Sequence, residues 1–263
     1  MMGKSINNDS KPKTGKKSPK KSQIVSEDRV SDYGEVYTAD REVKAMVDLV
    51  KDDAMKIEST FLEPACGDGN FLIEILERKL NTVFDRYRKS QTECEKYLVV
   101  AVGSIYGIDI LEDNVKRCRD RLFKLFKKMY HQKCKSYYSP SFEMVIRYIL
   151  ERNIVCGNAL SMKKVILKKD MSEQDILSTD ILEGDPIIFS QWSIAMGCNV
   201  KRRDFLFQEI LRTGENKTKK KESKDTVLEQ KTLDIEADMI ESFIEQPVRE
   251  YRAVHYMRLT DYE

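Results

Sequence analysis

The sequence feature that most constrains the fold is a short apolar strand followed by a glycine-containing turn and an amphipathic helix. The strand ends on Glu63, the turn contains Gly67 and Gly69 (hereafter the glycine turn), and apolar residues at helical spacing predict a helix over about residues 70–88. Glycine has no Cβ and a helix N-terminus carries partial positive charge, so this geometry brings backbone N–H groups close to a ligand. The turn alone fits either a ligand site or an ordinary strand-to-helix connection.

Residues 63–72 read Glu-Pro-Ala-Cys-Gly-Asp-Gly-Asn-Phe-Leu. This segment closely resembles the cofactor-binding motif of the amino-methylating DNA methyltransferases, Asp/Glu-Pro-Ala-Cys-Gly-x-Gly-x-Phe-Leu, at every fixed position. The resemblance implies that the chain binds S-adenosylmethionine. The residues that it assigns to this cofactor are Glu63, Pro64, Ala65, Cys66, Gly67, Gly69, Asn70 and Phe71.

A second segment with the same resemblance precedes the glycine turn. Gly34, Tyr37 and Thr38 match the family pattern Gly-x-x-Phe/Tyr-Thr-Pro, with Ala39 in place of the proline. In the family this segment packs beside the methionine end of the cofactor, so Tyr37 and Thr38 are expected there. Thr38 or Asp40 is expected to cap the following helix.

A second strand is expected at residues 105–109, with Asp109 at its carboxyl end. Ligands of open α/β sheets lie outside the carboxyl ends of the strands, and a carboxylate there can accept both hydroxyl hydrogens of a ribose. An aspartate that ends a strand is also a common helix cap. Together with the glycine turn one helix earlier, Asp109 is expected at the ribose of the cofactor, with Ile110 beside it.

The third strand and its exit are expected at residues 153–160. In the family an acidic residue that touches the adenine ring commonly stands where Asn158 does, followed here by Ala159. Asparagine can still accept a hydrogen bond from the exocyclic amine and donate one to a ring nitrogen. Strands that alternate with helices predict an α/β protein with a doubly wound, mostly parallel sheet and helices on both faces.

The expected catalytic motif is incomplete. Enzymes of this class place Asn/Asp/Ser-Pro-Pro-Tyr/Phe/Trp after the fourth strand, where the polar groups accept hydrogens from the target amine and the ring stacks on the flipped base. The chain contains no such tetrapeptide. Asp185 and Pro186 are the nearest candidates, with Ile187 and Ile188 in place of the proline and the aromatic residue. The alternative is that residues 186–192 form an ordinary buried strand after a turn.

The chain of 263 residues divides by composition. Residues 1–28 are expected to be a disordered basic arm, 29–212 the methyltransferase-like domain, 213–225 a charged linker, and 226–263 a C-terminal helix and a tail that packs back as an edge strand. Seven lysines and one aspartate give residues 1–22 a charge of +6, whereas the rest has 39 basic and 43 acidic residues. The arm fits either a nucleic-acid contact or a solvated tail.

Other classes of protein are disfavoured. No apolar stretch approaches the roughly 18 residues of a membrane span. The six cysteines form no Cys-x-x-Cys pair, and the two histidines are far apart, so no metal site is expected and a reduced, cytoplasmic protein fits best.

The resemblance therefore implies a methyltransferase of the adenine-N6 DNA type, within a restriction-modification or mobile-element system. No second domain of the size that reads DNA sequence is evident, so DNA is expected to be recognised through a partner specificity subunit. The alternative is a non-catalytic subunit that keeps the cofactor pocket, because the aromatic tetrapeptide is missing.

Overall fold

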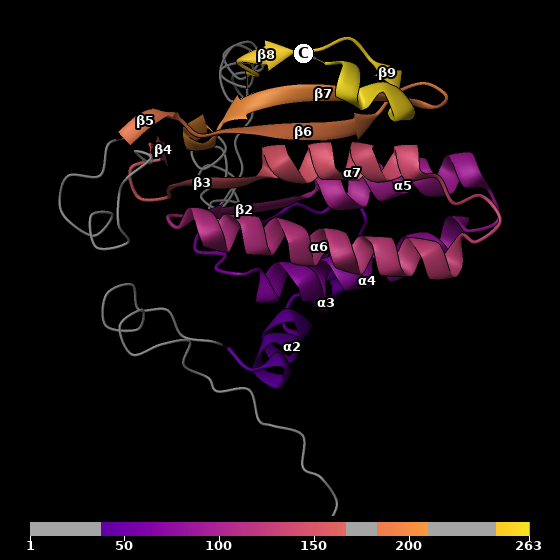
Figure 1. Ribbon diagram of the computed structural model, residues 1–263, viewed down its shortest axis with the longest axis horizontal. Coiled ribbons are helices and arrows are strands. Elements are labelled where there is room, and N and C mark those ends of the chain that lie inside the picture. The colour runs from indigo at the N-terminus through magenta and orange to yellow at the C-terminus, as the bar shows by residue number, and fades with distance from the viewer. Residues whose placement is uncertain (1–37, 167–182, 210–245, 263) are drawn as a thin grey trace, which may run out of the picture. The chain divides into compact units, whose positions relative to one another are not determined.

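The computed structural model describes residues 38–166, 183–209 and 246–262 (Figure 1). All of these residues fall in one compact unit that begins at Thr38. Tyr37, the basic arm expected over residues 1–28, the linker expected over 213–225 and the helix expected before residue 246 lie outside the described residues.

The first sheet has five strands in the order β1-β2-β3-β4-β5. Their bounds are β1 (Phe61–Glu63), β2 (Ile105–Asp109), β3 (Ile154–Asn158), β4 (Lys163–Val165) and β5 (Glu183–Pro186). The first three strands are parallel, whereas β4 runs antiparallel to both β3 and β5. The predicted α/β class is confirmed, and the sheet is mixed because the chain turns back directly after β3.

Two helices lie between β1 and β2 in the chain, and two lie between β2 and β3. They are α4 (Asn70–Tyr87), α5 (Gln91–Gly103), α6 (Glu112–Lys133) and α7 (Pro140–Asn153). The apolar face of α4 is buried, as its spacing predicted. Ser90 caps α5 by accepting a hydrogen bond from the backbone N–H of Glu93. None of the described helices combines the length and the apolar composition that crossing a membrane requires.

A second, antiparallel sheet packs against the first. Its strands are β6 (Ile188–Ile194), β7 (Asn199–Leu206), β8 (Arg249–Glu250) and β9 (Val254–His255), followed by the 3-10 helix η2 (Tyr256–Asp261). In Figure 1, α4 and α6 lie on one side of β2 and β3, and β6 and β7 lie on the other. Tyr106, Ile108 and Val155 of the first sheet form an apolar cluster with Ile187 and Phe189. One face of the first sheet is therefore covered in part by strands, where helices on both faces were predicted. The C-terminal edge strands are confirmed.

The helix α2 (Asp40–Asp48) and the short α3 (Lys51–Ala54) precede β1. The cap of α2 is Ala39, not Thr38 or Asp40 as predicted. Ala39 has extended dihedral angles, and its N–H donates to the carboxylate of Glu42 at 3.4 Å. This bond is the half of a capping box that the side chain of the third helical residue supplies, while the N–H of Glu42 donates to the carbonyl of Ala39 at 2.8 Å.

Candidate functional site

The glycine turn is held against the neighbouring strand. The N–H of Cys66 donates to the carbonyl of Ile108 in β2 at 2.8 Å, and the N–H of Gly69 donates to the carbonyl of Cys66 at 2.8 Å. Gly67 has φ +51° and Gly69 has φ +91°, in the left-handed region that L side chains rarely adopt. The conformation of the turn therefore depends on glycine at both positions.

The two glycines face different surroundings. A Cβ added at Gly67 would meet no atom within 4 Å, whereas one added at Gly69 would lie 2.6 Å from the Sγ of Cys118 on α6. Gly67 therefore leaves an open side at the turn, where a ligand can approach the backbone. Gly69 is required by packing inside the protein.

Asp109 lies beside the glycine turn, as predicted. Its Oδ2 accepts a hydrogen bond from the N–H of Gly67 at 2.8 Å, and its Oδ1 accepts from the N–H of Leu111 at 2.9 Å and from Nδ2 of Asn114 at 3.2 Å. The bond to Leu111 holds the start of α6, so Asp109 has the predicted role of a helix cap. This role does not exclude the other predicted role, a hydrogen bond to the ribose. A carboxylate has about four lone-pair sites, so Asp109 retains room for one further donor at Oδ2, not for two.

Arg121 of α6 holds the glycine turn from the other side. Its Nη1 donates to the carbonyl of Asp68 at 2.8 Å and pairs with the carboxylate of Asp68 at 2.5 Å, and its Nη2 donates to Oδ1 of Asn70 at 2.8 Å. Sequence reasoning missed this residue, because Arg121 is one of many basic residues on a helix whose outer face resembled a solvated surface.

The first N–H groups of α4 are available for hydrogen bonding. Gly69 caps this helix without a side chain, and the N–H groups of Asn70, Phe71 and Leu72 have no hydrogen-bond partner among the described residues. These donors and the positive end of the helix dipole favour an electron-rich group at the turn.

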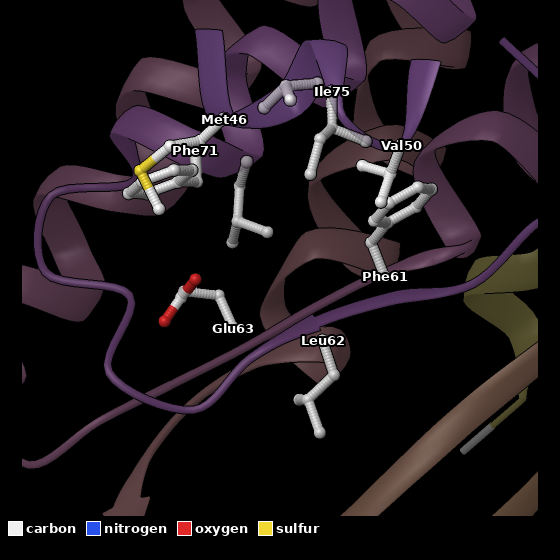
Figure 2. Close-up of a pocket in the computed structure, with 9 residues that line it drawn as sticks. Met46, Val50, Phe61, Leu62, Glu63, Phe71 and Ile75 are labelled. Carbon is white, nitrogen blue, oxygen red and sulfur yellow. The ribbon is translucent and has the colours of Figure 1, made fainter. Parts of the chain in front are cut away.

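A hollow of about 180 Å³ opens between α2, β1 and α4 beside the turn. Its lining is apolar except for Glu63, and includes Met46, Val50, Phe61, Phe71 and Ile75. Figure 2 shows the carboxylate of Glu63 directed from β1 into this space. Burial raises the pKa of Glu63, although a weak bond from the N–H of Ala65 at 3.4 Å opposes the rise. The hollow suits an apolar chain that carries a cationic group.

Cys66 is not a candidate nucleophile. Its thiol is buried, and a hydrogen bond with Cys118 together with burial strongly raises the pKa of Cys66. The thiol therefore stays protonated at neutral pH. It contributes packing beneath the turn and no thiolate chemistry.

The residues predicted near the adenine lie at the end of β3. Oδ1 of Asn158 accepts hydrogen bonds from the N–H groups of Leu160 at 2.9 Å and Ser161 at 3.4 Å. The amide oxygen is thus engaged in the turn toward β4, while Nδ2 of Asn158 has no partner among the described residues. Ala159 packs against the cluster between the two sheets.

The remaining predicted residues differ in position. Ile110 follows β2, and its carbonyl accepts a hydrogen bond from the thiol of Cys156 at 3.5 Å. Pro64 and Ala65 are exposed in the turn. Thr38 is partly buried just before α2, and Tyr37 lies outside the described residues.

The structure does not bring Asp185 or Pro186 to the glycine turn. Both are exposed on β5, at the opposite edge of the sheet from β1. The four strand spacings between β1 and β5 amount to roughly 19 Å. Phe189 is the first aromatic residue after Pro186 in the sequence. Its side chain is 2% exposed and packs edge-to-face against Tyr106. The segment that follows Pro186 forms the strand β6, in agreement with the ordinary-strand interpretation.

Comparisons with known proteins add no further information on this site. No protein-family model, curated protein or solved structure matches the chain. Within residues 38–166, 183–209 and 246–262, no three His, Cys, Asp or Glu side chains gather in a way that could hold a metal ion. The functional interpretation therefore rests on the motif and on the geometry of the turn.

Proposed function

We propose that the chain binds S-adenosylmethionine at the glycine turn and serves as the cofactor-binding part of an adenine-N6 DNA methyltransferase. The observation that carries this proposal is the open side of Gly67 next to the carboxylate of Asp109. In the proposal, the parallel strands β1 to β3 with α4 and α6 correspond to the cofactor half of a doubly wound methyltransferase sheet.

Each part of the cofactor has a chemically suitable neighbour. Oδ2 of Asp109 accepts one ribose hydroxyl, and Nδ2 of Asn158 donates to a ring nitrogen of the adenine. The methionine chain occupies the apolar hollow, where the carboxylate of Glu63 attracts its ammonium group. The unpaired N–H groups of α4 face the carboxylate end of the same chain.

Methyl transfer needs groups that the described residues do not supply at this site. The lone pair of the adenine amine attacks the methyl carbon, the carbon–sulfur bond breaks, and the amine loses a proton to an acceptor. The acceptor and a stacking ring must both lie at the methyl group. Since Asp185 is exposed on β5 and Phe189 is buried, we favour a subunit that acts on DNA with a partner chain over a self-contained enzyme.

Cofactor binding is tested with a pair of matched glycine variants. Wild-type protein titrated calorimetrically with S-adenosylhomocysteine should bind at micromolar levels, about −8 kcal/mol. Gly67→Ala should weaken binding at least tenfold, because the methyl group enters the open side of the turn. Gly197→Ala is the control, since Gly197 has φ +68° and an equally open surrounding in the turn between β6 and β7. A wild-type chain that gives no heat at millimolar ligand would refute the proposal.

Whether the chain is a subunit or a complete enzyme is tested by incubating it with radiolabelled S-adenosylmethionine and DNA. The isolated chain should bind the cofactor and transfer no methyl group. Transfer by the wild-type chain alone that is lost in Asp185→Ala would instead identify a self-contained enzyme. Such a result would require β5 to approach the glycine turn when DNA is bound.

A further inference from the structure

Arg121 connects the two residues that flank Gly69. One guanidinium nitrogen contacts both the carbonyl and the carboxylate of Asp68, and the other contacts the side chain of Asn70, at 2.5 to 2.8 Å. Cys118, one helical turn earlier on the same face of α6, lies directly beneath Gly69. A single face of α6 therefore sets the position of the turn at three consecutive residues.

We propose that Arg121 is a positioning residue of the cofactor site, an inference that rests on the proposed function. No atom of Arg121 lies within 4 Å of the position that a Cβ at Gly67 would take. Arg121 binds the carbonyl of the peptide unit before Gly69 and the side chain of Asn70 after it. These contacts restrain the start of α4, where the unpaired N–H groups lie. Earlier in the same turn, the carboxylate of Asp109 at the end of β2 accepts a hydrogen bond from the N–H of Gly67. The turn is thus held in its binding geometry before any ligand arrives.

The chemistry of arginine suits this role. The planar guanidinium presents its N–H groups in a fixed fork, so one side chain can satisfy a carbonyl and two side-chain oxygens at the same time. A lysine at this position would carry the charge but could not span Asp68 and Asn70 with defined geometry.

The contact is more than a surface ion pair. The side chains of Arg121 and Asp68 are 32% and 33% exposed, and an ion pair in such a setting contributes little to global stability. The bonds to the carbonyl of Asp68 and to Asn70 instead restrict the local conformation. Loss of Arg121 should therefore affect the turn and ligand affinity more than the unfolding of the whole chain.

The matched control is Arg119, two residues earlier on α6. Arg119 also binds backbone carbonyls, those of Ile154 and Glu151, each at 2.8 Å, but at the junction of α7 and β3. Arg121→Met should lower the affinity for S-adenosylhomocysteine at least tenfold. It should also accelerate amide exchange of the hydrogen-bonded N–H groups of Cys66, Gly67 and Gly69 in the ligand-free protein at least tenfold. Arg119→Met should change either quantity less than twofold. Arg121→Lys should fall between the wild type and Arg121→Met.

The outcomes separate this inference from the proposed function. Equal losses of affinity in Arg121→Met and Arg119→Met would reflect general destabilisation and overturn the inference, as would unchanged amide exchange at the turn in Arg121→Met. If the wild-type chain binds no cofactor, the proposed function fails. In that case faster exchange at the turn in Arg121→Met would still support the positioning role, and unchanged exchange would refute it.

Discussion

Lys79 of α4 provides a test of how the segment before β1 is held. Its side chain is fully buried, and its ammonium donates to the carbonyls of Lys56 at 2.7 Å, Ile57 at 3.1 Å and Ser59 at 2.6 Å. In the part of the chain that the structure describes, no carboxylate forms an ion pair with this ammonium. Lys79→Met removes these three hydrogen bonds, while the hydroxyl of Ser104 still donates to the carbonyl of Ile57. The carbonyls of Lys56 and Ser59 then have no donor among the described residues, so the chain that leads into β1 should loosen.

Two opposing effects determine how much Lys79→Met changes the free energy of unfolding. A buried carbonyl left unpaired costs about 1–3 kcal/mol. The bonds to Lys56 and Ser59 are only partly buried, so water replaces part of this loss. Burial lowers the pKa of Lys79 from 10.5 to about 8, against the smaller opposing effect of nearby Glu58 and Asp53. That difference corresponds to about 3 kcal/mol of destabilisation by the buried ammonium at neutral pH. The net cost of Lys79→Met at pH 7 is therefore a few kcal/mol at most.

The pH dependence gives the sharper prediction. Below pH 8 the side chain is protonated in both the folded and the unfolded chain, and its burial penalty is fully present. Between pH 8 and 10.5 the unfolded chain binds more protons, so the contribution of Lys79 to the free energy of unfolding rises with pH. The rise is about 1.4 kcal/mol per pH unit at most, and Lys79→Met lacks it. The wild type should thus gain about 2 kcal/mol over the variant between pH 8 and 9.5.

Urea denaturation of the wild type, Lys79→Met and the exposed control Lys124→Met at pH 7, 8 and 9.5 measures this difference. Other titrating groups are shared by all three chains, so their effects cancel in the comparison. Lys124→Met should follow the wild type at every pH. Parallel pH profiles for the wild type and Lys79→Met would show that Lys79 has an ordinary pKa and would refute the reasoning.

Three further predictions concern other positions. Gly69→Ala should destabilise the fold by at least about 2 kcal/mol because of its positive φ and its contact with Cys118. In urea denaturation, Cys118→Ala in the same chain should recover part of this loss. If the free-energy changes of the two substitutions simply add, the contact is contradicted. Tyr256→Phe should lower the free energy of unfolding by about 1.5–3 kcal/mol, because buried Glu95 loses a hydroxyl donor at 2.7 Å; a change under about 0.5 kcal/mol in denaturation would show that the bond contributes little. Asp185→Ala should leave the calorimetric affinity for S-adenosylhomocysteine within twofold of wild type, whereas a tenfold loss would locate Asp185 at the cofactor.

The part of the fold that surrounds the glycine turn could be predicted from local patterns. The strand expected at residues 105–109 is β2 (Ile105–Asp109), and the helix expected over 70–88 is α4 (Asn70–Tyr87). Apolar periodicity fixes such elements because one face of each helix must be buried. The meeting of Asp109 with Gly67 also follows, since carboxyl ends of neighbouring parallel strands share one edge of the sheet.

The rest depended on contacts that no local pattern encodes. The strand β4 has three residues, two of them lysines, so its sequence carries no sign that it would turn back on β3. The covering of β2 and β3 by β6 and β7 depends on apolar residues such as Ile187 and Phe189, which suit a strand in either sheet. Arg121 could not be distinguished from the other basic residues of α6 until the turn was placed beside it.

The order of strands bears on where a methyl group would be transferred. In the proposed function the methionine chain occupies the hollow between α2, β1 and α4, whereas the adenine lies near Asn158 on β3. A cofactor that extends from Asn158 to the hollow would have its sulfonium on the β1 side, and β5 lies beyond β3 on the adenine side. Asp185 would then be separated from the methyl group by the length of the cofactor. In the proposed arrangement a methyl acceptor would approach from the side of α2 and β1, where β1 pairs with no described strand other than β2.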